Sequence, residues 1–453
     1  MKTPIRRKVM KTKKALAVAL AATLCSTCAL TAGCVDKGEY VVLAEPPSKI
    51  EALSYSERTD KNFIAFKEKT DDFATTFAAA TYAAYKKESN FTVSPASVYM
   101  ALSLAATCAA KDTQTEILNA LNVSYNELNA YLPLLYRSLN VKHTTYVSET
   151  TKRESGRLQL TNSIWISNEA IAKQPCLDVL ANNFYCHARA VDFVNKNAEA
   201  NQAVRYFVNQ QTHGLIDKDF MFPTETLFVL LNTLYLKDIW NEDGDNLSFT
   251  DQKYSFENEN GSVVEKKLLK GYYLLGRAFE SEEYSGFYAQ TQHGYNIKFL
   301  LPKDGYSATN IFTRENLKEF NAVKDYKGVD HENQRRYYTR CLFPEYSAAY
   351  DEDVKNILKN TFGITQLFNP KTCDCSALTD EPIFCESVQH ATKLTVNKKG
   401  IEGAAVTSLG LGDTAVPEEY EKVYQDFIID RAFGFIITDS QDVTLFSGVV
   451  KSV

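Results

Sequence analysis

The stretch from Asn397 to Ala415 limits the possible folds of this chain more than any other part of it. Side chains of a strand alternate between its two faces, so every second residue from Ile401 onward forms one set. That set is Ile401, Gly403, Ala405, Thr407, Leu409 and Leu411, and it could line a buried face. The glycines among residues 403–412 nevertheless weaken a free-standing strand, and the acidic residues 418–421 favour solvent. The segment therefore suits both an exposed loop and a strand.

The alternative interpretation is an ordinary surface connector, because runs of small residues are common in long loops. The residues on both sides favour the first interpretation. They are Ser387 to Ala391 (SVQHA), Thr395 to Ala405 (TVNKKGIEGAA), Arg431 to Phe435 (RAFGF) and Leu445 to Val449 (LFSGV). These blocks resemble the reactive-loop hinge and the paired C-terminal strands of the serpins, protease inhibitors whose loop inserts into their own sheet.

The resemblance extends along most of the chain. Further blocks follow in family order: Asn90, Phe91, Ser94, Pro95, Ser97 and Val98; Thr212 to Ile216 (THGLI); Asn232 to Trp240 (NTLYLKDIW); Phe299 to Pro302 (FLLP); and Phe362 to Ile364 with Leu367 and Phe368. Together they span about residues 60 to 453. Each block is weak alone, but their order and spacing make the resemblance specific.

The resemblance implies the serpin fold, an α+β fold with three β-sheets, about eight or nine helices and an exposed reactive-centre loop at about residues 400–430. Local patterns agree with a mixed fold. Ser94 can cap a helix that begins at Pro95, and Thr113 with Glu116 forms a capping box pattern.

Two further patterns predict strands. The run Phe228 to Leu236 is mostly apolar, which is typical of a central strand covered on both faces. Residues Phe435–Thr438 and Val443–Val449 are expected to pair across a turn at Asp439–Asp442.

Composition is consistent with one large folded domain, which we place at residues 61–453. The chain has 453 residues, of which 45% are hydrophobic, so it can bury a large core. A net charge of -6 provides no basic stripe, which argues against a nucleic-acid partner.

The first 33 residues are expected to be a lipoprotein signal peptide. Six basic residues between positions 6 and 14 precede the apolar run Ala15–Leu30, which is short for a membrane span. The run ends in Leu30 to Cys34 (LTAGC), which resembles the bacterial lipobox and implies lipidation of Cys34 at the outer face of a membrane. The alternative is a plain signal peptide cut near Cys28 and a secreted chain. Residues 34–60 are polar, contain two prolines and are predicted to be a flexible tether.

The cysteines predict neither a metal site nor a full set of disulfides. After Cys25, Cys28 and Cys34 are set aside, seven of the ten remain, an odd number, and none has zinc spacing. We expect core residues or free thiols, with a Cys176–Cys186 bridge as the alternative that an exported location permits. No metal and no cofactor is expected.

Catalytic motifs do not emerge from the sequence. It contains no G-x-S-x-G elbow, no H-E-x-x-H, no P-loop and no dinucleotide fingerprint. A hydrolase that uses His390 with a serine is a possible reading of four polar residues, Ser94, Ser97, Asn232 and His390. The resemblance instead places these four in a shutter beneath the central sheet, and Trp240 at the breach where insertion begins. We therefore expect no enzyme.

The mechanism that the resemblance implies is irreversible, suicide-substrate inhibition of an extracellular serine protease, which becomes covalently attached to a monomeric inhibitor. The hinge is Gly400, Ile401, Glu402, Gly403, Ala404 and Ala405. Counting from the hinge places the reactive bond between Thr414 and Ala415. A small β-branched residue there suits an elastase-like or subtilisin-like protease, whereas cleavage after Leu411 would indicate a chymotrypsin-like one.

Two residues depart from the family pattern at the hinge. Ile401 is bulkier than the usual Thr or Val, and Lys398 replaces a residue that is usually acidic. Slow insertion would convert an inhibitor into a substrate, so the alternative function is a non-inhibitory serpin-fold surface lipoprotein that acts as a binding module. The acidic residues Glu418, Glu419 and Glu421 are predicted to contact a basic protease surface.

Overall fold

Residues 38–453 are described by the computed structural model, except 147–150, 241–246, 324–327 and 406–419, and the side chains of 146 and 402–405 are not described either. Within these ranges the chain forms ten α-helices and one 3-10 helix. The helices are α2 (Tyr55–Arg58), α3 (Lys61–Ala84), α4 (Pro95–Cys108), α5 (Lys111–Ala120), α6 (Tyr125–Ser138), α7 (Gln174–Phe184), α8 (Asn197–Gln211), α9 (Ala308–Ile311), α10 (Arg314–Ala322), α11 (Lys355–Phe362) and η1 (Gln366–Phe368).

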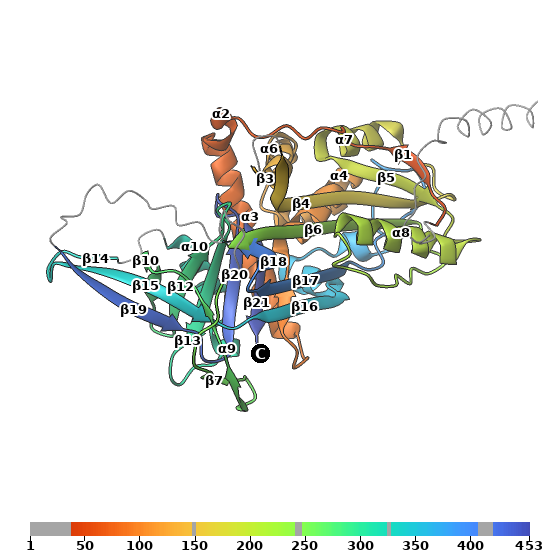
Figure 1. Ribbon diagram of the computed structural model, residues 1–453. Helices are drawn as coiled ribbons and strands as arrows, with labels where there is room; N and C mark the ends of the chain where they lie inside the picture. Colours follow the sequence, from red (N-terminus) through yellow and green to blue (C-terminus); the bar gives the residue numbers. More distant parts are fainter. Residues whose placement is uncertain (1–37, 147–150, 241–246, 324–327, 406–419) are drawn as a thin grey trace, which may run out of the picture. The chain divides into compact units, whose positions relative to one another are not determined.

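The largest sheet, here called the central sheet, has eight strands (Figure 1). Its order is β1-β5-β4-β6-β18-β17-β16, and β3 also pairs with β4. The strands are β1 (Val41–Ala44), β3 (Asn140–Tyr146), β4 (Lys152–Ser167), β5 (Cys186–Val191), β6 (Phe228–Trp240), β16 (Tyr346–Asp353), β17 (Gln389–Asn397) and β18 (Gly400–Ala405).

The other sheets are formed mainly by the C-terminal half of the chain. The six-stranded sheet has the order β11-β12-β13-β20-β21-β2, and the five-stranded sheet contains β9, β10, β14, β15 and β19, while β7 and β8 form a separate hairpin. Their bounds are β2 (Phe91–Val93), β7 (Tyr254–Glu257), β8 (Val263–Lys266), β9 (Leu269–Lys270), β10 (Leu274–Leu275), β11 (Ala278–Glu280), β12 (Tyr284–Gln290), β13 (Asn296–Pro302), β14 (Val329–Asp330), β15 (Arg335–Phe343), β19 (Glu421–Ile428), β20 (Phe433–Thr438) and β21 (Thr444–Val450). The α+β architecture with three main sheets is confirmed.

Strand β6 is buried on both faces, as its sequence predicted. Val229 and Leu231 pack in a cluster with Val204 of α8. Leu234 and Leu236 belong to the main core, which includes residues of α4. The predicted pairing of the C-terminal strands is also confirmed, because β20 and β21 are antiparallel neighbours.

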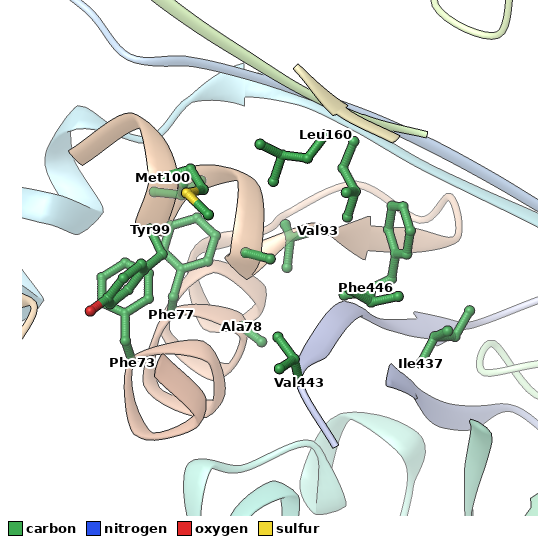
Figure 2. Close-up of a cluster of buried hydrophobic side chains, with 14 of the residues drawn as sticks. Phe73, Phe77, Ala78, Val93, Tyr99, Met100, Leu160, Ile437, Val443 and Phe446 are labelled. Carbon is green, nitrogen blue, oxygen red and sulfur yellow. The ribbon is translucent and has the colours of Figure 1, made fainter. Parts of the chain in front are cut away.

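The main core lies where helices α3 and α4 meet the sheets (Figure 2). Phe77 of α3, Met100 of α4 and Leu160 of β4 are all fully buried. Burial of each such side chain stabilises the fold by roughly 1.5 to 3 kcal/mol. This core holds the N-terminal end of α4 directly under the central sheet.

One predicted helix cap is confirmed and another is wrong. Ser94 caps α4, with Pro95 in the first turn, because its side chain accepts a hydrogen bond from the Ser97 backbone. The predicted Thr113–Glu116 capping box does not form, since α5 begins at Lys111 and has no side-chain cap. Glu116 instead accepts hydrogen bonds from the Thr365 and Gln366 backbone N–H groups, both at 2.7 Å. A tertiary contact thus replaces the local one.

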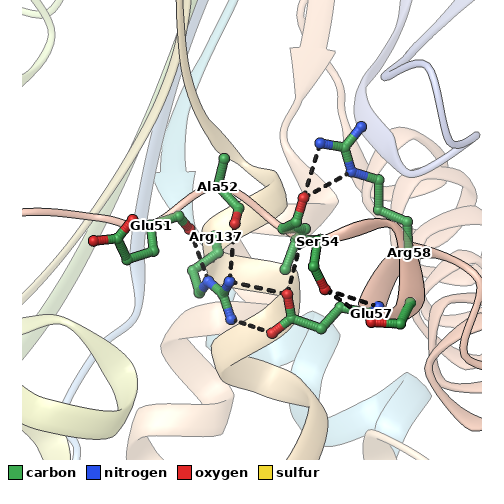
Figure 3. A network of polar contacts seen from close by, with 8 residues as sticks. Glu51, Ala52, Ser54, Glu57, Arg58 and Arg137 are labelled. Atoms are coloured by element: carbon green, nitrogen blue, oxygen red, sulfur yellow. Dashed lines mark hydrogen bonds and ion pairs between the residues drawn. The ribbon is translucent and has the colours of Figure 1, made fainter.

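The prediction of a flexible tether over residues 34–60 is wrong for residues 38–60. Strand β1 pairs with β5 at the edge of the central sheet, and Leu53 is buried. The guanidinium of Arg137 binds the carbonyl groups of Glu51 and Ala52 and the carboxylate of Glu57 (Figure 3). Backbone pairing and this arginine therefore fix a segment whose composition alone suggested a linker.

The seven described cysteines are free thiols, including Cys176 and Cys186, so the alternative Cys176–Cys186 bridge is absent. Six of them are buried. Burial raises the pKa of Cys385 to about 12. Most of these thiols are therefore core residues, as the first interpretation predicted.

Candidate functional site

The central sheet is divided between β6 and β17. Strand β6 pairs with β4 along one edge, from Phe228 to Asp238. Strand β17 pairs with β16 from Gln389 to Val396. In the part of the chain that the structure describes, only β18 lies between them, and it pairs with their ends alone. The remaining lengths of both edges can template a further strand.

The register of β18 is irregular where it meets the end of β6. Gly400 lies opposite Ile239, and Ile401, Glu402 and Gly403 all lie opposite Asp238, so the register shifts from residue to residue at the start of β18. Ala405 lies opposite Trp240, and the pairing of β18 with β6 is parallel. The hinge predicted at residues 400–405 therefore forms a strand against the end of β6, but only Gly400 and Ile401 pair with β17 as well, and Ile401 is fully buried.

Trp240, the predicted breach residue, fixes the turn that precedes the hinge. Its indole is fully buried and donates a hydrogen bond of 2.7 Å to the Asn397 carbonyl oxygen. The backbone of Lys398 donates to the Glu345 carboxylate at 2.7 Å and accepts from Leu247 at 2.8 Å. The Lys398 side chain itself is exposed. The turn is thus fixed by its backbone, independently of the side chain at position 398.

His390 attaches β17 to the first turn of α4. Its Nε2 accepts a hydrogen bond from the Ser94 backbone N–H at 3.1 Å, so the ring proton resides on Nδ1. The ring packs against Phe77, with centroids 5.9 Å apart. Burial lowers the pKa of His390 to about 3, so the ring is neutral near pH 7.

Asn232 attaches β6 to the same turn of α4. The Ser97 hydroxyl donates to Asn232 Oδ1 at 2.5 Å, and the Asn232 amide donates to Asn162 of β4. Two adjacent strands and one helix are joined by these contacts. The structure therefore brings all four predicted shutter residues together under the division between β6 and β17.

The same geometry does not form a Ser–His pair. His390 contacts the backbone of Ser94, while the Ser94 hydroxyl caps α4. The Ser97 hydroxyl is bound to Asn232. These side chains are buried and hydrogen-bonded to one another, an arrangement that holds strands and presents no nucleophile.

Sequence reasoning missed a polar cluster beside the hinge. Asp238, fully buried on β6, contacts His293 in the turn between β12 and β13, and His143 of β3 stacks on His293. A carboxylate inside the apolar run 228–240 was the signal that could have found it, because buried carboxylates need partners.

Several predicted residues lie outside the described residues: Cys34, Leu411, Thr414, Ala415, Glu418 and Glu419. Glu421 begins β19 and pairs with Arg335 at 2.9 Å. The loop predicted at about 400–430 is therefore shorter, because β18 and β19 occupy its two ends.

The family model described as Serpin (serine protease inhibitor) matches residues 68–453. The chain therefore belongs to the serpin family. This places it in a family whose members are mostly inhibitors of serine proteases and not catalytic enzymes.

Individual relatives agree with this assignment. Iripin-1 of Ixodes ricinus is 29% identical over 81% of this chain and 90% of its own length. Alpha-1-antitrypsin 1-3 of Mus musculus is 24% identical over 80% of this chain and 83% of its own. The native-state crystal structure of the thermophilic serpin tengpin has a TM-score of 0.69 and 21% identity, and the match covers 92% of this chain and 100% of that one.

Neither a metal-binding cluster nor a membrane-spanning helix is present among the described residues. No group of three or more His, Cys, Asp or Glu side chains there could hold a metal ion. None of the helices in the described ranges combines the length and the apolar character that crossing a bilayer requires.

Proposed function

We propose that this serpin is an irreversible inhibitor of an extracellular serine protease, acting by acyl-enzyme trapping and loop insertion. The observation that carries the proposal is the partly inserted hinge. Strand β18 already occupies one end of the division between β6 and β17, and the edges beyond it are unpaired among the described residues. The sheet is therefore arranged to receive a longer strand.

In the proposed reaction, the protease serine attacks the Thr414 carbonyl carbon, and the bond to Ala415 breaks as its nitrogen takes a proton. The cleaved hinge is then free to extend between β6 and β17. Some fourteen inserted residues, at about 3.3 Å each, would carry the attached protease ~45 Å. New backbone hydrogen bonds and the burial of Leu409 and Leu411 would drive this step.

The bulky Ile401 does not oppose this mechanism. Before any cleavage, its backbone is already in register with the ends of β6 and β17, and its side chain is fully buried. The sheet thus accommodates the larger residue at the start of the insertion path. Lys398, which replaces a usually acidic residue, does not oppose insertion either, because backbone contacts hold that turn.

The proposed target is elastase-like or subtilisin-like, because Thr414 is small and β-branched. Residues 401–421 contain neither Lys nor Arg, which disfavours a trypsin-like protease. Glu418 and Glu419 remain candidates for contact with a basic protease surface, whereas Glu421 is already paired with Arg335.

We place the inhibitor at a bacterial cell surface as a monomer, attached through a lipid on Cys34 after removal of residues 1–33. Because residues 38–60 pack on the folded domain, little of the chain is left to act as a spacer. The inhibitory domain would then lie near the membrane surface.

The test mixes purified residues 34–453 with pancreatic elastase and follows the products by denaturing gel and mass spectrometry. We expect a stable covalent adduct and a released peptide that begins at Ala415. Cleavage without an adduct would contradict inhibition and favour the binding-module alternative.

A pair of hinge variants controls for the mechanism. In a regularly inserted strand, Gly403 would lie on the same face as Ile401, and Ala404 would lie on the opposite face. Gly403→Arg should therefore block insertion and yield cleaved inhibitor, while Ala404→Arg, with the same added charge, should keep most of the adduct. Equal loss in both variants would contradict insertion in this register.

A further inference from the structure

Gly156 of the central sheet has no side chain, and His293 of the neighbouring six-stranded sheet occupies the space beside it. Gly156 of β4 lies opposite His143 of β3 on one side and opposite Asp238 of β6 on the other. A Cβ atom at Gly156 would lie 2.3 Å from Asp238 Oδ1 and 2.9 Å from His293 Nδ1. The absence of a side chain at position 156 is therefore what allows His293 to approach Asp238.

His293 is contacted at both ring nitrogens and on one face of its ring. Its backbone N–H donates to Asp238 Oδ2 at 3.1 Å, and its Nδ1 contacts Asp238 Oδ1. Its Nε2 lies 3.3 Å from the Ser155 hydroxyl. The His143 ring stacks on it, with centroids 4.0 Å apart and planes 11° apart. These contacts fix both the position and the orientation of the imidazole.

The turn that carries His293 is held by its own hydrogen bonds. The Thr291 backbone donates to the Tyr295 carbonyl oxygen at 2.8 Å, and the Tyr295 backbone donates to the Thr291 hydroxyl at 2.8 Å. The Tyr295 hydroxyl also lies 3.2 Å from His143 Nε2. The six-stranded sheet therefore contacts β6 through a turn that is already ordered.

This contact lies at the strand position where the register of β18 shifts. Ile401, Glu402 and Gly403 are all in register with Asp238. On the other side of the division, β16 and β17 pack on β2 and β21 of the six-stranded sheet. Separation of β6 from β17 must therefore displace at least one of them relative to that sheet, and on the β6 side the contact with His293 opposes the displacement.

We propose that Asp238, His293 and His143 form a latch that holds β6 on the six-stranded sheet and limits the rate at which the hinge inserts. The proposal rests on the insertion mechanism above and assigns positioning residues to it. Removal of Asp238 or His293 would release β6 and speed insertion.

The latch contains three titratable groups whose charges depend on one another. Burial raises the pKa of Asp238, and the hydrogen bond and charge of His293 oppose that rise. Burial and the neighbouring His293 lower the pKa of His143 to about 4. Tyr295 faces the cluster from the same turn as His293, and burial raises its pKa above the ordinary value.

The charged side chains beside the latch on β3 and β4 are paired with one another. Glu154 accepts from Lys142 at 2.9 Å and from Arg157 at 2.6 Å. Acid therefore weakens the latch itself: either Asp238 becomes neutral, or His143 becomes a cation stacked on His293. Insertion should accelerate as the pH falls from about 7 towards 4.

The experiment measures sheet opening without any protease. A fluorescent synthetic peptide of residues 401–414 is added to residues 34–453, and its uptake is followed between pH 7.5 and pH 4.5. Asp238→Asn and His293→Gln should take up peptide at least about tenfold faster at pH 7.5, because each removes one partner of a buried hydrogen-bonded pair and leaves the other without it. Both variants should also lose the acceleration in acid that the unaltered chain shows.

Glu154→Gln is the matched control. It removes a carboxylate beside the latch but leaves the three latch residues unchanged, so the rate of peptide uptake should not change. Gly156→Ala is a second way to separate His293 from Asp238, and it should also speed peptide uptake. It serves as the test if Asp238→Asn or His293→Gln fails to fold. Uptake rates and pH profiles equal to those of the unaltered chain in all folded latch variants would overturn the proposal.

Complex formation with elastase, measured for the same variants, tests the proposed inhibition independently of the latch. Faster peptide uptake in the variants without any covalent adduct would support the latch and contradict inhibition. Adduct formation by all variants with unchanged uptake would support inhibition and contradict the latch. No uptake by any chain would contradict both.

Discussion

The division between β6 and β17 is held at two places by different chemistry. At the shutter, His390 and Asn232 join the two strands to α4 through hydrogen bonds between uncharged groups. At the hinge, Asp238 of β6 is joined to His293 of the six-stranded sheet by an acid–imidazole contact that includes titratable groups.

The difference suggests separate roles in one conformational change. Hydrogen bonds between neutral buried groups depend on geometry, and losing one partner leaves the other unsatisfied at any pH. A carboxylate–imidazole contact depends also on protonation. The shutter would therefore set how stable the closed sheet is, and the hinge would set when it opens.

The largest effect is expected at the hinge end, from Trp240→Ala. Loss of a fully buried indole leaves a cavity and costs about 3 to 5 kcal/mol in the free energy of unfolding. It also removes the 2.7 Å hydrogen bond to the Asn397 carbonyl. Denaturant unfolding measures the loss, and Trp240→Phe, which keeps most of the volume, should lose less than half as much. Equal losses would mean that the hydrogen bond, and not packing, dominates.

The shutter residue His390 should make the free energy of unfolding depend on pH in the acid range. The pKa of His390 falls from 6.5 to about 3 on folding. Between these pH values the unfolded chain binds a proton that the folded chain excludes, so the free energy of unfolding falls as the pH falls, by up to about 1.4 kcal/mol per pH unit.

His390→Asn removes this titrating group and keeps an acceptor for the Ser94 N–H. The difference in the free energy of unfolding between the unaltered chain and this variant should therefore narrow as the pH falls from 6.5. Burial raises the pKa of Asp439 to about 6, which gives a slope of opposite sign, but that group is common to both chains. Urea unfolding at several pH values measures the difference. Parallel curves would contradict a neutral buried His390.

The resemblance in sequence located the shutter and the hinge but not the latch. Ser94, Ser97, Asn232, His390 and Trp240 lie in blocks that match the family, and their contacts followed once the strands were placed. Asp238 lies in such a block too, but its partner His143 comes from β3 and its partner His293 from a turn distant in the sequence. Only the tertiary fold brings these three together.

The N-terminal segment and Glu116 illustrate the same limit. Residues 38–60 have the composition of a linker, yet β1 pairs with β5 and Arg137 binds the carbonyl groups after it. Glu116 has the spacing of a capping box, yet it caps residues 365 and 366. Local patterns predicted strands and one cap well where burial agreed with them, and failed where a long-range hydrogen bond competed.

The smallest effect is expected from Ser97→Ala, and it tests whether the shutter is insensitive to pH. The substitution removes one hydroxyl and leaves Asn232 Oδ1 without that donor, at a cost of about 1 to 3 kcal/mol. No group that titrates between pH 4 and 8 is changed, so the loss in the free energy of unfolding should be the same at pH 5 and pH 8. Asp238→Asn, measured beside it, should show a loss that varies with pH, because it removes a carboxyl group whose pKa is raised by burial. If both losses varied alike, the two ends of the division would be coupled through β6, and the assignment of stability to one and timing to the other would be wrong.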